Sequence, residues 1–202
     1  MYPVHYHVEH PAQFTRLQLL VRAIAFFALG VVGISFGTVF VFGYVALPAF
    51  AAIRLGSRTQ ETYIADDGAK IVRALHWFAA ICAWAGLISD RLPSKSPDET
   101  VELVVTPTAH PTARSALWRV VTGIPSALVL ALLGGLAGIV WLWAALSILI
   151  SERVGQYAFE FLVGVQRWSI RLLAYQASLV DDYPPFSFAD GAAPLPPARA
   201  TS

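Results

Sequence analysis

Two long stretches of the chain are apolar and lack charged residues. No Asp, Glu, Lys or Arg occurs between residues 23 and 53, or between residues 120 and 151. A helix needs about 20 apolar residues to cross the roughly 30 Å hydrocarbon core of a bilayer, and each stretch is longer than that. A soluble chain of 202 residues could hardly bury two helices that are apolar on every side. The pattern therefore predicts an all-α membrane protein.

The ends of the two membrane helices can be estimated from proline and glycine. Pro125 predicts a kink or a new helix start, which places one membrane helix at about residues 126–150. The other is expected within residues 25–52. Each charge-free stretch would exceed the thickness of the hydrocarbon core if it were fully helical. We therefore expect tilt, an interfacial start, or a break at a glycine of the first stretch, namely Gly30, Gly33 or Gly37.

Each apolar stretch is followed by a polar turn and a second, less apolar helix, predicted at about residues 68–89 and 157–180. If these helices are also embedded, the fold has about four transmembrane or membrane-embedded helices. The alternative for the second helices is an amphipathic position in the membrane interface.

The same order of features occurs twice, about 100 residues apart. Segments of strand character at Val4–Val8 and Val101–Thr106 each precede a His-Pro pair, which begins at His10 in one case and at His110 in the other. An apolar helix and a second helix follow each pair. We therefore expect a tandem two-helix repeat. Its parts are a first unit at residues 1–95, a second unit at residues 96–188 and a Pro/Ala-rich tail at residues 189–202.

An even number of crossings in each unit would place the amino terminus, the linker at residues 91–117 and the tail on the same side of the membrane. That side would hold slightly more Lys and Arg than the other, which favours cytoplasmic amino and carboxyl termini. The two strand-like segments could then pair in a small sheet, because an isolated strand leaves its backbone groups unsatisfied. Two extended linkers are the alternative.

The second unit ends in a distinctive pattern. It has an R-W-x-x-R spacing from Arg167 to Arg171, then Tyr175, then the closing sequence DDYPPF. With these features, residues 101–188 resemble an uncharacterised bacterial integral-membrane family. The first unit looks like a diverged copy, with His76 and Ala80 opposite the two arginines. The resemblance implies a membrane protein of unknown function and supplies no activity.

Candidate contact residues are concentrated in this motif. Arg167 and Arg171 lie four residues apart, hence on one helix face, and Glu160 is a candidate partner. The closing Tyr-Pro-Pro-Phe is interpreted as a docking clasp that meets the protein's own surface or a neighbour. The residues expected to contact a partner or lipid are Arg167, Trp168, Arg171, Tyr175, Tyr183, Pro184, Pro185 and Phe186.

Metal and cofactor chemistry is weakly represented. His5, His7 and His10 form an H-x-H-x-x-H cluster that makes them weak metal candidates, although polar strand and turn residues are the preferred interpretation. His76 is the lone histidine of the predicted membrane helices, and bis-histidine haem ligation needs two. One cysteine, Cys82, excludes an intrachain disulfide and a cysteine-based cluster. We expect no cofactor, and a net charge of +1 argues against nucleic-acid binding.

These features predict a non-enzymatic accessory or scaffolding subunit of a larger membrane protein complex, located as a multi-pass protein in a bacterial inner membrane. Its expected partners are membrane lipids and that assembly. The alternative is a small lipid-handling or transport protein that uses Arg167 and Arg171 for anionic headgroups. No nucleotide-binding, zinc-protease or nucleophile motif supports an enzyme.

Overall fold

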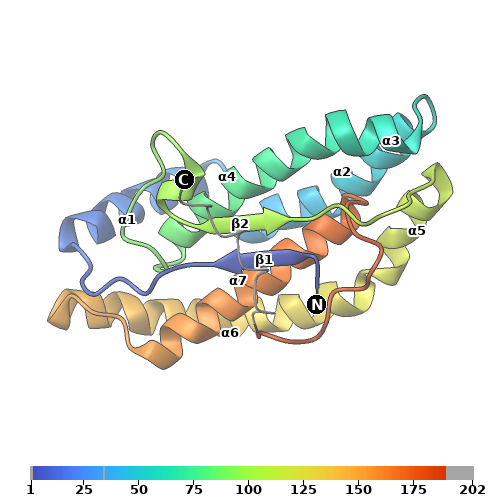
Figure 1. The fold of residues 1–202 in the computed structure, drawn as a ribbon. Helices are drawn as coiled ribbons and strands as arrows, with labels where there is room; N and C mark the ends of the chain where they lie inside the picture. The colour runs from blue at the N-terminus through green and yellow to red at the C-terminus, as the bar shows by residue number, and fades with distance from the viewer. Residues whose placement is uncertain (1, 34, 190–202) are drawn as a thin grey trace, which may run out of the picture.

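The computed structural model describes residues 2–33 and 35–189, and it is mostly helical (Figure 1). The predicted tail therefore lies outside the described residues, apart from its first residue. In chain order the elements are β1 (Val4–His7), α1 (Arg16–Val31), α2 (Phe36–Leu55), α3 (Gln60–Thr62), the π-helix η1 (Tyr63–Gly68), α4 (Ala69–Ala85), the 3-10 helix η2 (Pro97–Glu99), β2 (Glu102–Val105), α5 (Ala113–Thr122), α6 (Ile124–Ser151) and α7 (Gln156–Gln176).

Two helices are long and apolar enough to cross a membrane, at Gly37–Leu55 in α2 and Ile124–Ser151 in α6. Only 17% and 11% of the most apolar windows of these helices are buried within the protein. Among the described residues, α4 and α7 do not meet the same test, so two of the four expected helices have the length and composition of a span. In contrast to α2 and α6, α7 is enclosed by its neighbours along most of its length.

Both charge-free stretches are interrupted, the first by a break, which was one of the three expected alternatives. The first apolar stretch breaks between α1 and α2, where Gly33 has a φ of +76° and the Ser35 side chain caps α2 in a capping box with Thr38. A positive φ is accessible to glycine at little cost, which explains why the break falls there. In the second stretch, α5 ends at Thr122 and Pro125 lies in the first turn of α6.

The two strands form the small sheet that their sequences suggested. β1 and β2 pair antiparallel, with Val4 opposite Val105 and His7 opposite Glu102. β1 packs on α7 and β2 packs on α4. The strand of each half of the chain therefore covers the second helix of the other half.

The elements form three layers. The sheet lies on α4 and α7, and α7 in turn packs against α2 and α6 on its opposite side (Figure 1). Each short lead-in helix packs on the apolar helix of the other half, α5 on α2 and α1 on α6. The core is thus centred on α7, whose Ile170, Leu172 and Ala174 are fully buried.

The antiparallel sheet corrects the expected arrangement of the halves. At one end of the molecule, here called the first end, the backbone N–H of Phe14 donates to the Glu152 carbonyl at 2.8 Å. At the opposite, second end, Gln60 contacts His110 at 2.8 Å. Two crossings in each unit would have placed Arg16 and Glu152 on different sides of the membrane, but these residues form an ion pair at the first end. The reason is that β1 and β2 are antiparallel. The helix that follows β1, α1, therefore begins at the first end, whereas the helix that follows β2, α5, begins at the second end.

Candidate functional site

The predicted clasp, residues 183–186, continues into residues 187 and 188, and the whole segment 183–188, called the clasp from here on, folds back onto the protein's own helices. The Tyr183 hydroxyl contacts the Ser126 side chain at 2.7 Å and accepts a hydrogen bond from the Ser126 backbone N–H at 3.1 Å. That N–H belongs to the first turn of α6, where backbone donors have no partner within the helix. The rings of Tyr175 and Tyr183 meet edge to face, 5.7 Å between centroids. The clasp therefore joins the end of α7 to the start of α6.

The two prolines and Phe186 complete this segment. Pro184 is buried and Pro185 is half-buried, whereas the Phe186 side chain remains 57% exposed. The Phe186 ring contacts Trp168 of α7 edge to face, 5.2 Å between centroids. Phe186 is thus held in a defined orientation with much of its apolar surface available for contact.

Phe188 packs closely on α7 at Gly164. A Cβ placed on Gly164 would lie 2.6 Å from Cγ of Phe188, a distance that forces one of the two to move. The Phe188 ring also meets Phe161 edge to face, 5.9 Å between centroids. Glycine at position 164 is therefore required for the last residue of the clasp to seat on the helix.

Arg167 and Arg171 bind backbone carbonyls within the protein. Nε of Arg167 donates to the Tyr6 carbonyl of β1 at 3.0 Å, and Nη1 donates to the Phe188 carbonyl. Nη2 of Arg171 donates to the Ala189 carbonyl at 3.0 Å, and its guanidinium lies 5.5 Å from the centre of the Tyr2 ring. Both arginines are buried. The two arginines thus tie the amino-terminal strand and the clasp to α7. Glu160, which the sequence suggested as their partner, contacts the Gln156 side chain at 2.8 Å.

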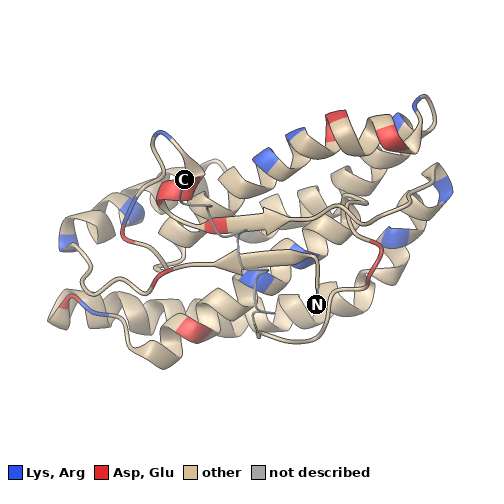
Figure 2. Cartoon of the chain, viewed as in Figure 1, with Lys and Arg blue, Asp and Glu red and all other residues tan. Residues whose placement is uncertain are grey.

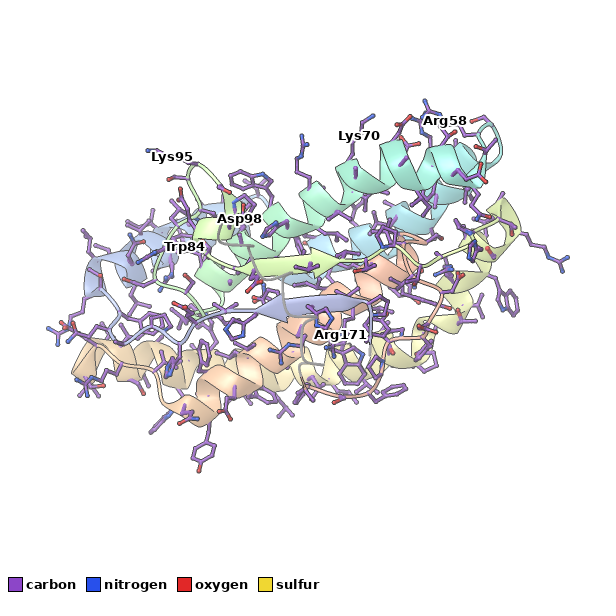
Figure 3. The ribbon with its side chains drawn as sticks, in the orientation of Figure 1. Arg58, Lys70, Trp84, Lys95, Asp98 and Arg171 are labelled. Atoms are coloured by element: carbon purple, nitrogen blue, oxygen red, sulfur yellow. The ribbon has the colours of Figure 1, made fainter. Side chains whose placement is uncertain are left out.

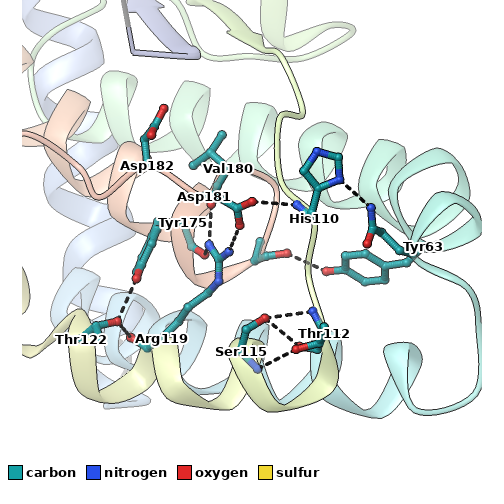
Figure 4. A network of polar contacts seen from close by, with 12 residues as sticks. Tyr63, His110, Thr112, Ser115, Arg119, Thr122, Tyr175, Val180, Asp181 and Asp182 are labelled. Atoms are coloured by element: carbon teal, nitrogen blue, oxygen red, sulfur yellow. Dashed lines mark hydrogen bonds and ion pairs between the residues drawn. The ribbon is translucent and has the colours of Figure 1, made fainter.

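A third arginine, Arg119 of α5, organises the turn after α7 (Figure 4). It donates to the Tyr175 carbonyl at 2.9 Å and to the Val180 carbonyl, and it forms an ion pair with Asp181 at 2.5 Å. Its guanidinium also lies 4.6 Å from the centre of the Tyr175 ring. Arg119 itself is buried, so its charge is balanced by one carboxylate and two carbonyls inside the protein.

Further hydrogen bonds connect this network to the second end of the molecule. The second carboxylate oxygen of Asp181 accepts the backbone N–H of His110 at 2.8 Å. The Tyr63 hydroxyl donates to the Ala177 carbonyl at 2.6 Å, and burial raises the pKa of Tyr63. The Thr122 hydroxyl contacts the Tyr175 hydroxyl at 2.8 Å. Figure 4 shows Arg119 and Tyr63 reaching the turn after α7, with Thr122 of α5 against Tyr175 of α7.

Arg22 of α1 makes matching contacts after α4. It donates to the Ser89 carbonyl at 2.6 Å, lies 3.6 Å from the Asp90 carboxylate, and faces the Trp84 ring at 5.2 Å. Arg22 is fully buried, and desolvation lowers its pKa to about 10 despite the opposing effect of Asp90. The Asp90 carboxylate also accepts the backbone N–H of Thr15 at 3.1 Å.

The sequence reasoning missed both Arg22 and Arg119. A signal was nevertheless present, because each arginine lies in the lead-in to an apolar stretch and each second helix is followed by an aspartate, Asp90 or Asp181. Their pairing depends on which lead-in helix meets which turn. Composition and periodicity do not contain that information.

The histidines are placed apart. His5 is buried on β1 and His7 is exposed, while Nε2 of His10 lies 3.0 Å from the Val154 carbonyl and its ring stacks on Phe159 at 4.2 Å. His76 contacts the Val101 carbonyl at 3.0 Å. Within residues 2–33 and 35–189, no group of three or more His, Cys, Asp or Glu side chains is arranged to hold a metal ion. Burial raises the pKa of the Cys82 thiol to about 12.

Comparison with known families identifies one domain. Residues 113–187 match a domain of unknown function, DUF4389, which here comprises α5, α6, α7 and most of the clasp. This agrees with the resemblance of the second unit to an uncharacterised family. No curated protein and no solved structure matched the chain.

Proposed function

We propose that this protein is a non-enzymatic accessory or scaffolding subunit of a membrane protein complex, held in a bacterial cytoplasmic membrane. Its expected contacts are membrane lipids through its apolar helices and a partner subunit through the exposed aromatic surface of the clasp. The proposal includes termini on the cytoplasmic side.

The observation that carries the proposal is the large number of apolar side chains exposed on α1, α2, α5 and α6. Monomeric soluble proteins rarely expose apolar patches larger than a few hundred Å². Here most of the large exposed apolar side chains lie on these four helices. They include Leu17, Leu20, Ile24, Phe27, Val41, Phe42, Val45, Ile53, Leu117, Trp118, Leu128, Leu132, Leu136, Ile139, Leu142, Trp143, Leu149 and Ile150.

The contacts of the arginines support a scaffolding function. Arg119, Arg167 and Arg171 all donate to backbone carbonyls that close the fold. A lipid-handling protein would need guanidinium groups directed at a headgroup site. We therefore place the lipid-handling alternative second.

An internal duplication is part of the proposal. The contacts of Arg22 with the turn after α4 match those of Arg119 with the turn after α7, including an aspartate that accepts a backbone N–H. Leu87 and Ser178 occupy the same place in the two turns, each three residues before its aspartate and each with a positive φ. These correspondences support two diverged copies of one unit, of which the second retains the DUF4389 features.

Gentle-detergent purification from the native membrane, followed by native gel electrophoresis and mass spectrometry, tests the proposal. We expect the wild-type chain to migrate with a stoichiometric partner. Phe186→Ser removes the exposed clasp ring and is expected to release that partner. Tyr157→Ser is the matched control, because Tyr157 is an 89% exposed aromatic residue at the first end, away from the clasp.

Recovery of the wild-type protein as a lone monomer with bound lipid would reject the accessory role and favour lipid handling. Loss of the partner in both variants, or in neither, would reject the clasp as the contact surface.

A further inference from the structure

We propose that the long axis of the molecule lies in the plane of the membrane, with α1, α2, α5 and α6 immersed in a single leaflet and with no helix crossing the bilayer. This inference rests on the proposed membrane association, and it replaces the multi-pass arrangement suggested by the sequence. The occupant of the apolar face is the acyl-chain region of that leaflet.

The linker between the halves is the first argument. It leaves α4 at the first end, where Asp90 contacts Thr15, and it reaches the second end at His110. Between these points it runs outside α4 and carries exposed charged residues (Figure 2). These are Arg91, Lys95, Asp98, Glu99 and Glu102. If the helices crossed the bilayer along their length, the linker would have to carry these charges through the hydrocarbon, where charged side chains are rare and costly.

The sheet is the second argument. The two antiparallel strands lie lengthwise along the molecule, with their axes roughly aligned with those of α4 and α6 (Figure 1). A crossing orientation would therefore place a two-stranded sheet with open edges inside the bilayer. Open edges leave backbone N–H and C=O groups without partners, and such edges do not occur in contact with lipid. The sheet must lie outside the hydrocarbon.

The distribution of charge along α4 and α7 is the third argument. Lys70 and Arg73 of α4 and Glu160 of α7 are exposed between the two ends of the molecule. Figure 3 shows Lys70 projecting outward from α4, away from the other helices. The segments 37–53 of α2 and 124–151 of α6, which form the opposite layer, carry no charged residue. The boundary between water and lipid therefore follows the length of the helices.

Helix length and aromatic placement agree with this orientation. The 28 residues of α6 span roughly 42 Å, which exceeds the roughly 30 Å core, so a crossing α6 would have to tilt. A helix that lies in the plane has no such length limit. The exposed Trp118 and Trp143 are amphipathic residues of the kind that anchor at the level of the headgroups.

A double-cysteine variant distinguishes the two orientations. In a Cys82→Ala background, Arg153→Cys marks the first end and Arg114→Cys marks the second end. Both arginines are exposed. Sealed inverted and right-side-out membrane vesicles are treated with a membrane-impermeant polyethylene-glycol maleimide, which shifts the band on a denaturing gel once for each modified cysteine. Detergent-solubilised protein, which should show two shifts, is the control for reactivity.

In-plane binding predicts two shifts from one side of the membrane and none from the other. One shift per molecule from each side would overturn the inference, because it would place the two ends on opposite sides. Release of the protein into the soluble fraction by an alkaline wash would also overturn the inference, because it would show that the apolar helices are not immersed in the leaflet. Absence of a partner in native purification would affect only the accessory role.

Discussion

Asp90 and Asp181 hold equivalent positions, each accepting a backbone N–H from the segment that leads into an apolar helix while it pairs with an arginine of that lead-in helix. Asp90 accepts from Thr15 and faces Arg22, and Asp181 accepts from His110 and binds Arg119. Asp90 thereby fixes the turn after α4 to the start of α1, and Asp181 fixes the turn after α7 to the segment before α5. This pair of contacts sets how the helix layers are joined at the two ends of the molecule.

Asp181→Asn should lower the free energy of unfolding by about 1–2 kcal/mol, because a neutral amide cannot balance the buried Arg119 guanidinium. The measurement is thermal or chemical unfolding of the purified protein in detergent. Asp182→Asn is the matched control, because the neighbouring Asp182 is exposed and accepts a hydrogen bond from Tyr2 through its backbone carbonyl. Equal loss of stability in both variants would contradict the assigned role of Asp181.

Arg22→Gln should destabilise the protein more strongly, by about 3 kcal/mol or more. Arg22 is fully buried, and with a pKa of about 10 it is charged at neutral pH, so the substitution leaves Asp90 without its buried partner. Arg16→Gln on the same helix is the control, because Arg16 is exposed and pairs with Glu152 at the surface. Unfolding curves that are indistinguishable for the two variants would argue against the Arg22 contacts.

Gly164→Ala should destabilise the protein by about 1–3 kcal/mol, because its Cβ would meet the Phe188 ring at 2.6 Å. Displacement of the ring is also expected to expose the end of the clasp to limited proteolysis, which can be followed by mass spectrometry. Gly134→Ala provides the contrast, because nothing lies within 4 Å of a Cβ at that position of α6. Replacing this glycine should be neutral or slightly stabilising through helix propensity.

Asp67 predicts a dependence of stability on pH. Its carboxylate accepts two hydrogen bonds from Arg54, at 2.7 and 3.0 Å, and these bonds lower the pKa of Asp67. A lowered folded-state pKa contributes stability above the ordinary aspartate pKa of about 4, and this contribution is lost as the pH falls through the lowered value. Wild-type protein should therefore melt above Asp67→Asn at pH 7, and the difference should disappear in strong acid.

Asp66→Asn controls for general effects of charge in the same turn. The Asp66 side chain is 60% exposed, and the structure places it 3.6 Å from Arg58. The melting temperature of the Asp66→Asn variant should equal that of the wild-type protein at every pH. A pH-independent difference between wild type and Asp67→Asn would show that the Arg54 contact does not control the titration.

The sequence by itself determined the local elements. Charge-free stretches identified the two apolar helices, and strand-like segments before each His-Pro pair predicted a sheet. Pro125 marked one interruption, and Gly33 was one of three glycines named for the other. These features depend on neighbouring residues and on periodicity, so they can be predicted without knowing which elements meet. The aromatic and proline residues of the clasp were recognised for the same reason.

Only the tertiary structure decided the relative direction of the two halves and the partners of the arginines. Antiparallel pairing of β1 with β2 brings Glu152 to Arg16, whereas two membrane crossings in each unit would have placed these residues on opposite sides. It also brings the Tyr6 carbonyl to Arg167, while the turn after α7 delivers Asp181 to Arg119. Such contacts join residues far apart in the chain, and several of the acceptors are backbone carbonyls that every residue carries. Their identity depends on strand direction and helix packing, which no pattern along the chain contains.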